Sequence, residues 1–298
     1  MSEASRQHGQ LRFGLCADVH QDIMHDGEAR LWVFVEAMQR ADVDFVVQLG
    51  DFCRPYDYNR AFLSIWEGLD MPRYHVLGNH EVDGGFTREQ VLEYWGAERR
   101  YYSFDRGGCH FVVLDGNDVR EGAPEGYPRY IAPDQLAWLR DDLAGTAART
   151  FLFSHQTLEA DDGLENAAEL RNLLEAENGR AGWNKVAASF SGHHHIDGAV
   201  TLGGIHYIQI NSMSNFWMGE QYQCVRYGDE VDAEYPFIKY TAPYRDPLYA
   251  VVTVDDGALT IEGVESEWAG PSPAELGYPV AGMEERIAPR IASVRLEL

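Results

Sequence analysis

The sequence is poor in basic residues and has no apolar stretch long enough to cross a membrane. Its 298 residues include 24 lysines and arginines against 48 aspartates and glutamates, which gives a formal net charge of −24. Such a chain is not attracted to nucleic acid or to an anionic membrane surface, so neither is expected as a partner. It would also repel an anionic substrate at long range. A site for such a substrate therefore needs local positive charge, which bound metal ions commonly supply.

Cysteine is scarce as well. The four cysteines (Cys16, Cys53, Cys109 and Cys224) lie far apart in the sequence and form no Cys-x-x-Cys pair. This spacing indicates neither a thiolate zinc site nor a disulfide framework. The first residues, MSEASRQHGQ, lack the basic start and the apolar run of a signal peptide. We therefore expect a cytoplasmic protein, although a chain from which a leader had been removed would look the same.

The sequence does have ample apolar material for a core, with 45% hydrophobic and 12% aromatic residues. Apolar runs at residues 11–17, 44–49 and 73–77 are typical of strands. The segments 28–40 and 59–69 between them have the periodicity of amphipathic helices. This alternation of strand and helix predicts an α/β layered fold.

A second set of elements is predicted further along the chain. It comprises helices at 87–95, 133–143 and 166–175, and strands at 101–105, 109–115, 150–154, 187–191, 204–211, 249–254 and 258–264. Residues 228–246 are rich in acids, aromatics and prolines and are expected to form an irregular covering segment. We expect a polar tail at residues 1–10 and one domain over 11–298, in which 216–298 is the least assignable part and a candidate cap over the site.

Five short polar motifs follow predicted strands. They are Asp18-Val19-His20, Gly50-Asp51, Gly78-Asn79-His80-Glu81, Ser154-His155 and Gly192-His193-His194-His195. Each motif alone is weak, because Gly-Asn-His is compatible with an ordinary turn and Gly-His-x-His with a loop or a single-metal site. In open α/β sheets, however, sites form outside the carboxyl ends of the strands. The five motifs together therefore predict one shared site.

This ordered set, which falls between residues 11 and 211, resembles the motifs of the calcineurin-like metallophosphoesterase family. The resemblance implies a metal-dependent phosphoester hydrolase with a four-layer α/β/β/α sandwich of two mixed sheets flanked by helices. It also implies a dinuclear metal centre at the strand ends. By motif position, the first metal ion would be held by Asp18, His20, Asp51 and His195, and the second by Asp51, Asn79, His155 and His193.

The chemistry of these side chains agrees with that implication. Carboxylate and amide oxygens with imidazole nitrogens suit divalent ions such as Mn²⁺, Fe²⁺ or Zn²⁺, among which the sequence does not choose. Two such ions can clamp the attacking and leaving oxygens of an in-line displacement, with a metal-bridging hydroxide as the nucleophile. No Gly-x-Ser-x-Gly elbow is present to supply a serine instead.

The resemblance implies a catalytic role for His80, beside the metal ions, where it would assist the leaving oxygen or stabilise charge on the phosphoryl group. A histidine with a pKa near neutrality suits such proton work. The alternative is that His80 merely supports Asn79. Glu81, which follows it, either orients this loop or faces solvent.

The chain departs from the family pattern at one place. Many family members carry a second aspartate three residues after the bridging one, where it orients the catalytic histidine; here that position is Arg54. An arginine cannot accept the imidazole proton, so Asp57 or Glu81 is a candidate replacement. We hypothesise that Arg54 contacts the substrate phosphate through its planar fork. The alternative is a surface arginine paired with an acid.

The most favoured function is therefore hydrolysis of a small phosphorylated substrate. A phosphomonoesterase is preferred, because Arg54 would neutralise the extra charge of a terminal phosphate. A phosphodiesterase of the cyclic-nucleotide type is the first alternative. A catalytically silent interaction scaffold and a single-ion metal-binding module are alternatives from other classes.

Overall fold

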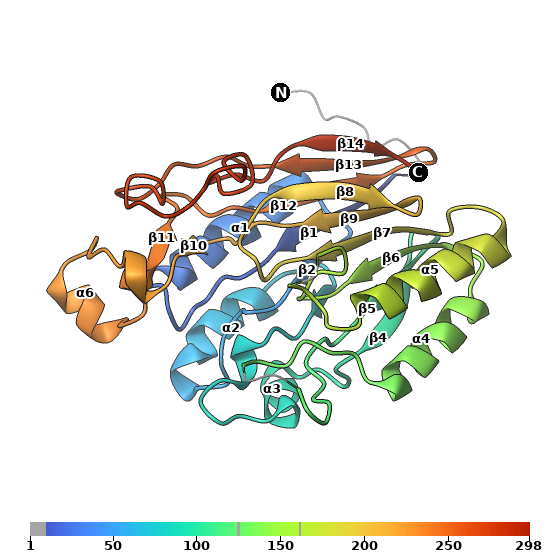
Figure 1. Ribbon diagram of the computed structural model, residues 1–298, viewed down its shortest axis with the longest axis horizontal. Helices are drawn as coiled ribbons and strands as arrows, with labels where there is room; N and C mark the ends of the chain where they lie inside the picture. The colour runs from blue at the N-terminus through green and yellow to red at the C-terminus, as the bar shows by residue number, and fades with distance from the viewer. Residues whose placement is uncertain (1–9, 124–125, 161) are drawn as a thin grey trace.

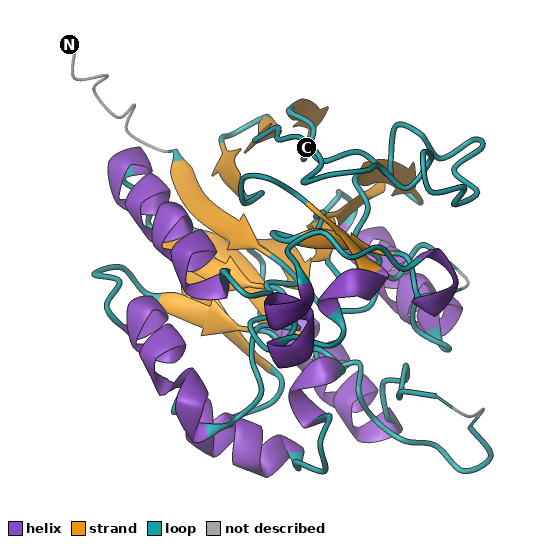
Figure 2. Ribbon diagram, turned by 90° about the vertical axis from the view of Figure 1, so that its left-hand side faces the viewer, coloured by secondary structure: helices purple, strands orange, loops and turns teal. Residues whose placement is uncertain are grey.

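The computed structural model describes residues 10–123, 126–160 and 162–298 (Figure 1). The polar tail expected at residues 1–10 therefore lies outside the described residues except for Gln10. Two six-stranded sheets face each other across an apolar core, and helices cover their outer faces (Figures 1 and 2). This is the predicted four-layer α/β arrangement. Among the described residues, no helix has both the length and the apolar composition needed to cross a bilayer.

The first sheet has the strand order β14-β13-β12-β1-β2-β3. Its strands are β1 (Leu11–Cys16), β2 (Phe45–Gln48), β3 (Arg73–His75), β12 (Ala250–Val254), β13 (Ala258–Gly263) and β14 (Val294–Glu297). β1, β2 and β3 are parallel, whereas β12, β13 and β14 are joined to one another and to β1 by antiparallel pairing. The C-terminal part of the chain thus completes this sheet.

The second sheet has the order β4-β5-β6-β7-β9-β8. Its strands are β4 (Tyr102–Arg106), β5 (Cys109–Val113), β6 (Arg149–Phe153), β7 (Val186–Ser191), β8 (Gly198–Leu202) and β9 (Ile205–Gln209). The four central strands are parallel, and β4 and β8 are antiparallel edges. The parallel strands of both sheets direct their carboxyl ends to the loops that carry the polar motifs.

The helices lie on the two outer faces. They are α1 (Gly27–Ala41), α2 (Arg60–Glu67) and α3 (Arg88–Trp95) on the first sheet, and α4 (Pro133–Gly145) and α5 (Ala167–Ala181) on the second. On the first sheet, Phe34 and Met38 of α1 pack with Val46 of β2. On the second, Leu139 of α4 and Leu170 of α5 pack in one apolar cluster with strand residues. The burial of one apolar face on each helix explains why the sequence periodicity located them.

The core between the sheets is built largely from phenylalanine. Phe13 stacks on Phe45 with ring centroids 4.9 Å apart, and its ring meets the edges of three more rings at 5.7 to 5.9 Å. Those rings belong to Phe111, Phe153 and Phe190 of the opposite sheet. Such pairs add about 0.5–1.5 kcal/mol each beyond area burial, so the two sheets are held face to face.

Several elements differ from the expectation. The strands β8 and β14 were not predicted, and neither was the small two-stranded sheet of β10 (Asn215–Trp217) and β11 (Thr241–Pro243). A short helix, α6 (Asp229–Glu234), lies within the segment expected to be irregular. Helix α5 also continues to Ala181, beyond its predicted end at residue 175.

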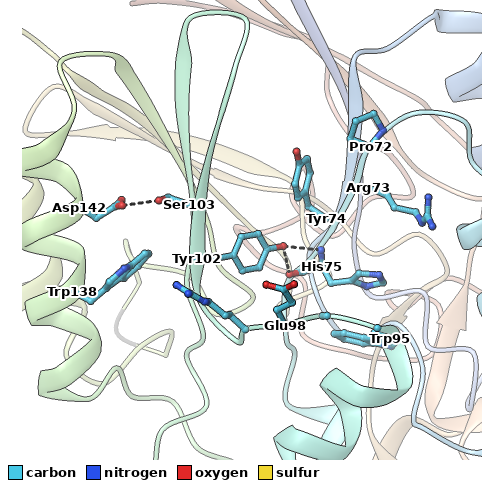
Figure 3. A pocket seen from close by; sticks show the side chains of 13 residues that line it. Pro72, Arg73, Tyr74, His75, Trp95, Glu98, Tyr102, Ser103, Trp138 and Asp142 are labelled. Carbon is cyan, nitrogen blue, oxygen red and sulfur yellow. Dashed lines mark hydrogen bonds between the residues drawn. The ribbon is translucent and has the colours of Figure 1, made fainter.

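Tyr102 joins the edges of the two sheets (Figure 3). Its hydroxyl accepts a hydrogen bond from the backbone N–H of His75 (3.1 Å) and donates one to the His75 carbonyl (3.0 Å). These bonds satisfy backbone groups on the edge strand β3 that would otherwise be open to pairing. A cavity of about 700 Å³ lies beside this contact, with Trp95 and Trp138 among its lining residues. It shares no lining residue with the cleft at the strand ends described below.

Candidate metal centre

The polar motifs come together at one edge of the sandwich. The side chains concerned follow β1 (Asp18, His20), β2 (Asp51), β3 (Asn79, His80), β6 (His155) and β7 (His193, His195). Because both sheets deliver residues to this edge, the site lies across the seam between them. All seven predicted metal ligands lie at this edge. Six of them form two groups of three, and Asn79 lies beside the second group.

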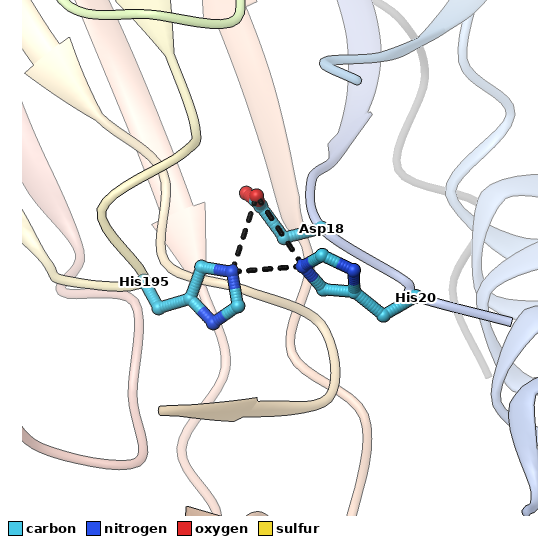
Figure 4. Close-up of side chains that lie close together, drawn as sticks. All are labelled: Asp18, His20 and His195. Carbon is cyan, nitrogen blue, oxygen red and sulfur yellow. Dashed lines mark hydrogen bonds and ion pairs between the residues drawn. The ribbon is translucent and has the colours of Figure 1, made fainter. Parts of the chain in front are cut away.

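The first group consists of Asp18, His20 and His195, which point toward one another (Figure 4). The Nε2 atoms of His20 and His195 are 3.0 Å apart. From Asp18 Oδ1, the distance is 3.3 Å to His195 Nε2 and 3.9 Å to His20 Nε2. All three side chains are buried, so one carboxylate oxygen and two imidazole nitrogens share a small volume away from bulk water.

The second group consists of Asp51, His155 and His193, with Asn79 beside it. His155 Nε2 is 3.2 Å from Asp51 Oδ2, 3.1 Å from Asn79 Oδ1 and 3.1 Å from His193 Nδ1. Asp51 also reaches the first group, because its Oδ2 is 3.7 Å from His20 Nε2. One carboxylate therefore lies between the two groups.

The outer nitrogens of two imidazoles are fixed by backbone carbonyls. His155 donates from Nδ1 to the carbonyl of Leu49 (2.8 Å), and His195 donates from Nδ1 to the carbonyl of Asn215 (2.7 Å). In the neutral rings, Nε2 is therefore an unprotonated acceptor aimed at the centre. His155 Nε2 then faces the Asp51 and Asn79 oxygens, which are acceptors too. A proton on His155 Nε2 can form a hydrogen bond with one of these oxygens at a time. A divalent cation can bind the nitrogen and both oxygens at once, so this set of ligand atoms fits a metal ion.

The backbone is strained where these side chains are presented. In the described part of the chain, six non-glycine residues have positive φ, and five of them are predicted ligands. They are Asp18 (51°), His20 (51°), Asp51 (52°), His193 (73°) and His195 (53°). Such φ values are uncommon outside glycine and persist only where the surrounding structure enforces them. The fold therefore holds these side chains in one orientation at an energetic cost, as is typical of functional sites.

Gly78 and Glu81 shape the loop around Asp51. A Cβ atom at position 78 would lie 2.2 Å from Asp51 Oδ1 and 2.3 Å from its backbone nitrogen, so only glycine fits there. The Glu81 carboxylate accepts hydrogen bonds from the backbone N–H groups of Asp51 (3.1 Å), Phe52 and Gly78 (2.6 Å). Glu81 is 1% exposed. Of the two alternatives considered for Glu81, it orients the loop and does not face solvent.

The electrostatics of the centre favour bound positive charge. Burial alone opposes ionisation of Asp51, but the imidazoles of His155, His80 and His20 outweigh it and hold the pKa of this carboxyl well below its usual range. Burial disfavours the charged form of His155, yet the Asp51 carboxylate raises its pKa to about 10. Burial lowers the pKa of His20 and of His193. Asp51 is thus an ionised carboxylate whose countercharge is the protonated ring of His155, and a bound cation would take over that role.

His80 and Arg54 line a cleft beside the centre, together with His20, Asp22 and Asp51. The His80 side chain is 36% exposed, and its ring centroid is 5.3 Å from that of His20. Arg54 donates from Nη2 to Asp83 Oδ2 at 3.2 Å, and its side chain is 18% exposed. Arg54 is therefore paired with an acid, yet it remains at the wall of the cleft.

Two further residues at the site were not predicted. Asp83 accepts a hydrogen bond from His80 Nδ1, and the Tyr127 hydroxyl lies 3.1 Å from His193 Nε2. Neither Asp57 nor Glu81 contacts the His80 ring among the described interactions, so the two candidates for orienting it were wrong. The spacing of Asp83, three residues after His80, was a usable signal. Tyr127 lies in a long loop without a motif, and nothing in the sequence pointed to it.

The sequence matches a family model described as calcineurin-like phosphoesterase over residues 11–197. No curated protein matches it. Among solved structures, a dimetal phosphatase from Danio rerio is similar, with 19% identity, a TM-score of 0.63, and coverage of 87% of this chain and 98% of that one. GAP50, the anchor in the inner membrane complex of Plasmodium, is similar with 15% identity, a TM-score of 0.52, and coverage of 88% and 85%. At these identities, the structural likeness concerns the fold alone.

Proposed function

The chain belongs to the calcineurin-like phosphoesterase family, and from this premise we propose that it hydrolyses a small phosphate monoester at a pair of divalent cations. Family membership makes the protein a metal-dependent phosphoester hydrolase with a dinuclear centre. The identity of the ligands, the roles of the neighbouring residues and the preference for a monoester are the proposal. The single observation that carries it is the convergence of buried Asp and His donors into two adjoining groups.

One cation would be held by Asp18, His20, Asp51 and His195, and the other by Asp51, Asn79, His155 and His193. The contact of Asp51 Oδ2 with both His20 and His155 supports its assignment as the shared ligand. The donor set of oxygen and imidazole nitrogen, without thiolate, is compatible with Mn²⁺, Fe²⁺ or Zn²⁺. When bound, a pair of such ions makes water a usable nucleophile at neutral pH and neutralises charge on the phosphoryl oxygens.

His80 would give a proton to the departing alkoxide or phenoxide oxygen. Its Nδ1 is occupied by Asp83, which leaves Nε2 as the atom that can face the substrate. Burial opposes the protonated ring, but the Asp51 and Asp83 carboxylates outweigh it and raise the pKa of His80 to about 9. The Asp83 carboxylate, which is not among the proposed metal ligands, would support the protonated ring that a general acid needs.

Arg54 would contact the phosphate. Its guanidinium uses Nη2 for Asp83 and has further N–H groups at the wall of the cleft. A terminal phosphate carries more negative charge than a diester, so a cation at this position favours the monoester. Replacing Arg54 with alanine should therefore raise KM for a monoester. Unchanged kcat and KM would rule this contact out.

Paired assays test the proposal. We expect the purified protein with added Mn²⁺ to hydrolyse 4-nitrophenyl phosphate faster than bis(4-nitrophenyl) phosphate, and to bind two metal ions per chain. Substituting Asp51 with alanine should lower the metal content and abolish turnover, whereas the exposed Glu93 of α3 offers a matched control. Faster hydrolysis of the diester would assign a phosphodiesterase instead. Two bound ions without turnover of any phosphoester would indicate a silent scaffold.

A further inference from the structure

We propose that Asp83 is the positioning residue for His80 and that Arg54 holds the Asp83 carboxylate in place. The inference rests on the proposed function, because it assumes that His80 protonates the leaving oxygen. Position 54, three residues after Asp51, is an arginine, which cannot accept a hydrogen bond from the His80 ring. The contacts of the His80 ring assign the orienting acid to a different loop.

The local backbone explains how Asp83 reaches His80. His80 opens a short 3₁₀ helix, η2 (His80–Val82), and Asp83 is the residue that ends it. In a 3₁₀ helix, side chains three positions apart eclipse one another, so residue 83 returns to the same side as residue 80. The Asp83 N–H also bonds to the His80 carbonyl (3.3 Å), which closes the turn. The two side chains are thus brought together by local structure alone.

Two contacts fix His80 from different directions. Its backbone N–H donates to Asp51 Oδ1 (2.8 Å), which ties the main chain to the shared carboxylate. Its Nδ1 donates to Asp83 Oδ2, which fixes the ring. With both hydrogen bonds formed, the remaining ring nitrogen, Nε2, is held in one orientation.

Arg54 reaches the same oxygen of Asp83 from the β2 loop. Its Nη2 donates to Asp83 Oδ2 at 3.2 Å, and its own backbone N–H is held by Asp22 Oδ2 at 2.7 Å. The Asp83 side chain is 42% exposed, so the Arg54 contact adds a second restraint on its rotation to the one that His80 provides. Arg54 thereby links the loop after β2 to the loop after β3.

The test uses the dependence of the rate on the leaving group. A general acid matters for phenyl phosphate, whose phenoxide is a poor leaving group, and much less for 4-nitrophenyl phosphate. With Mn²⁺ present, Asp83→Ala and Asp83→Asn should lower kcat for phenyl phosphate by roughly 10- to 100-fold, less than the roughly 10²- to 10⁴-fold contribution of a general acid, because His80 itself remains. The loss on 4-nitrophenyl phosphate should be several times smaller. A residue that supports only the fold would affect both esters equally.

A double-substitution cycle and a spectroscopic measurement complete the design. His80→Ala should show the same leaving-group pattern, and adding Asp83→Ala to it should cause no further loss, because the two residues act as a unit. Asp57→Ala, an exposed aspartate nearby, is the matched control and should leave both rates unchanged. In the zinc-loaded, diamagnetic protein, the low-field ¹H signal of the His80 Nδ1 proton should disappear in Asp83→Ala while two ions per chain remain bound.

The outcomes separate this inference from the proposed function. Suppose that the parent protein is active, and that the Asp83 variants lose the same fraction of activity on both esters or the losses multiply in the double variant. The role of Asp83 is then wrong, and the proposed function stands. A parent protein that binds metal and hydrolyses neither ester overturns the proposed function, and the role of Asp83 with it.

Discussion

At the scale of single residues, Glu81 is the side chain on which the loop geometry most depends. Its carboxylate gathers three backbone N–H groups from the loops after β2 and β3, and those loops carry Asp51 and Asn79. Burial and the neighbouring Asp51 charge raise the pKa of Glu81 to about 8. Three backbone donors therefore depend on this one acid.

Replacing Glu81 with alanine should therefore destabilise the protein and weaken metal binding. Buried N–H groups left without an acceptor cost about 1–3 kcal/mol, and the strained loop at Asp51 would relax. Urea unfolding of the metal-free protein would measure the first effect, and calorimetric titration with Mn²⁺ the second. Glu81→Gln, which keeps one acceptor oxygen, should fall between parent and alanine variant. Glu93→Ala is the control; if Glu81→Ala matches it in both measurements, the loop does not depend on this carboxylate.

The sequence could predict much of the site at this scale, for a definite reason. Asp18, Asp51 and His155 each follow an apolar strand, and parallel strands must bring their carboxyl ends to one edge. Asp83 and Tyr127 were missed because the order of the strands does not determine where their side chains point. Asp83 depends on a 3₁₀ turn, and Tyr127 on the path of a long loop.

At the scale of elements, the limits of prediction follow from burial. Helix α6 has no buried residue, so apolar periodicity had nothing to detect there. Strand β8 is an edge strand that is mostly exposed, although the Gly203-Gly204 turn before β9 was a hairpin signal that went unused. The strands β1, β2 and β7 were located correctly, because each is buried on both faces and therefore appears in the sequence as a continuous apolar run.

One contact between elements contains a histidine whose pKa is raised by two carboxylates. His110 of β5 meets Asp105 Oδ1 of β4 through Nδ1 (2.7 Å) and Asp142 Oδ2 of α4 through Nε2 (2.9 Å). Burial opposes the charged ring, but the hydrogen bonds to Asp142 and Asp105 outweigh it and raise the pKa of His110 above its usual value. The His110 ring thus ties the hairpin of β4 and β5 to α4, and its raised pKa favours the charged form.

This contact should make a pH-dependent contribution to stability. Because the folded-state pKa is raised, the contribution is complete below the unfolded pKa of about 6.5 and is lost as the pH rises through the folded value. His110→Gln should therefore destabilise the protein more at about pH 6 than at about pH 9, as urea unfolding would measure. His206→Gln is the control, because the His206 ring contacts a hydroxyl and a carbonyl. A loss for His110→Gln that is the same at both pH values would show that the ring is not charged in the folded state.

At the scale of the whole molecule, the candidate centre joins the two sheets. In the first group, Asp18 and His20 come from the first sheet and His195 from the second. In the second group, Asp51 comes from the first sheet, and His155 and His193 from the second. A cation in either group is therefore a link across the sandwich. It also neutralises buried carboxylates in a chain whose net charge is −24, where further negative charge is costly.

Removal of metal should accordingly lower the stability of the entire fold. A ligand that binds only the folded state at 100 times its Kd adds about 2.7 kcal/mol per site, so chelation should lower Tm by several degrees and added Mn²⁺ should restore it. Scanning calorimetry on the chelator-treated and Mn²⁺-loaded protein measures this shift. Because Asp51 contacts both groups, Asp51→Ala should shrink the Mn²⁺-dependent shift more than Asp18→Ala, which removes a donor from one group only. Equal shifts in the two variants would mean that the two cations do not share Asp51. The ligands would then have to be assigned to the two cations differently.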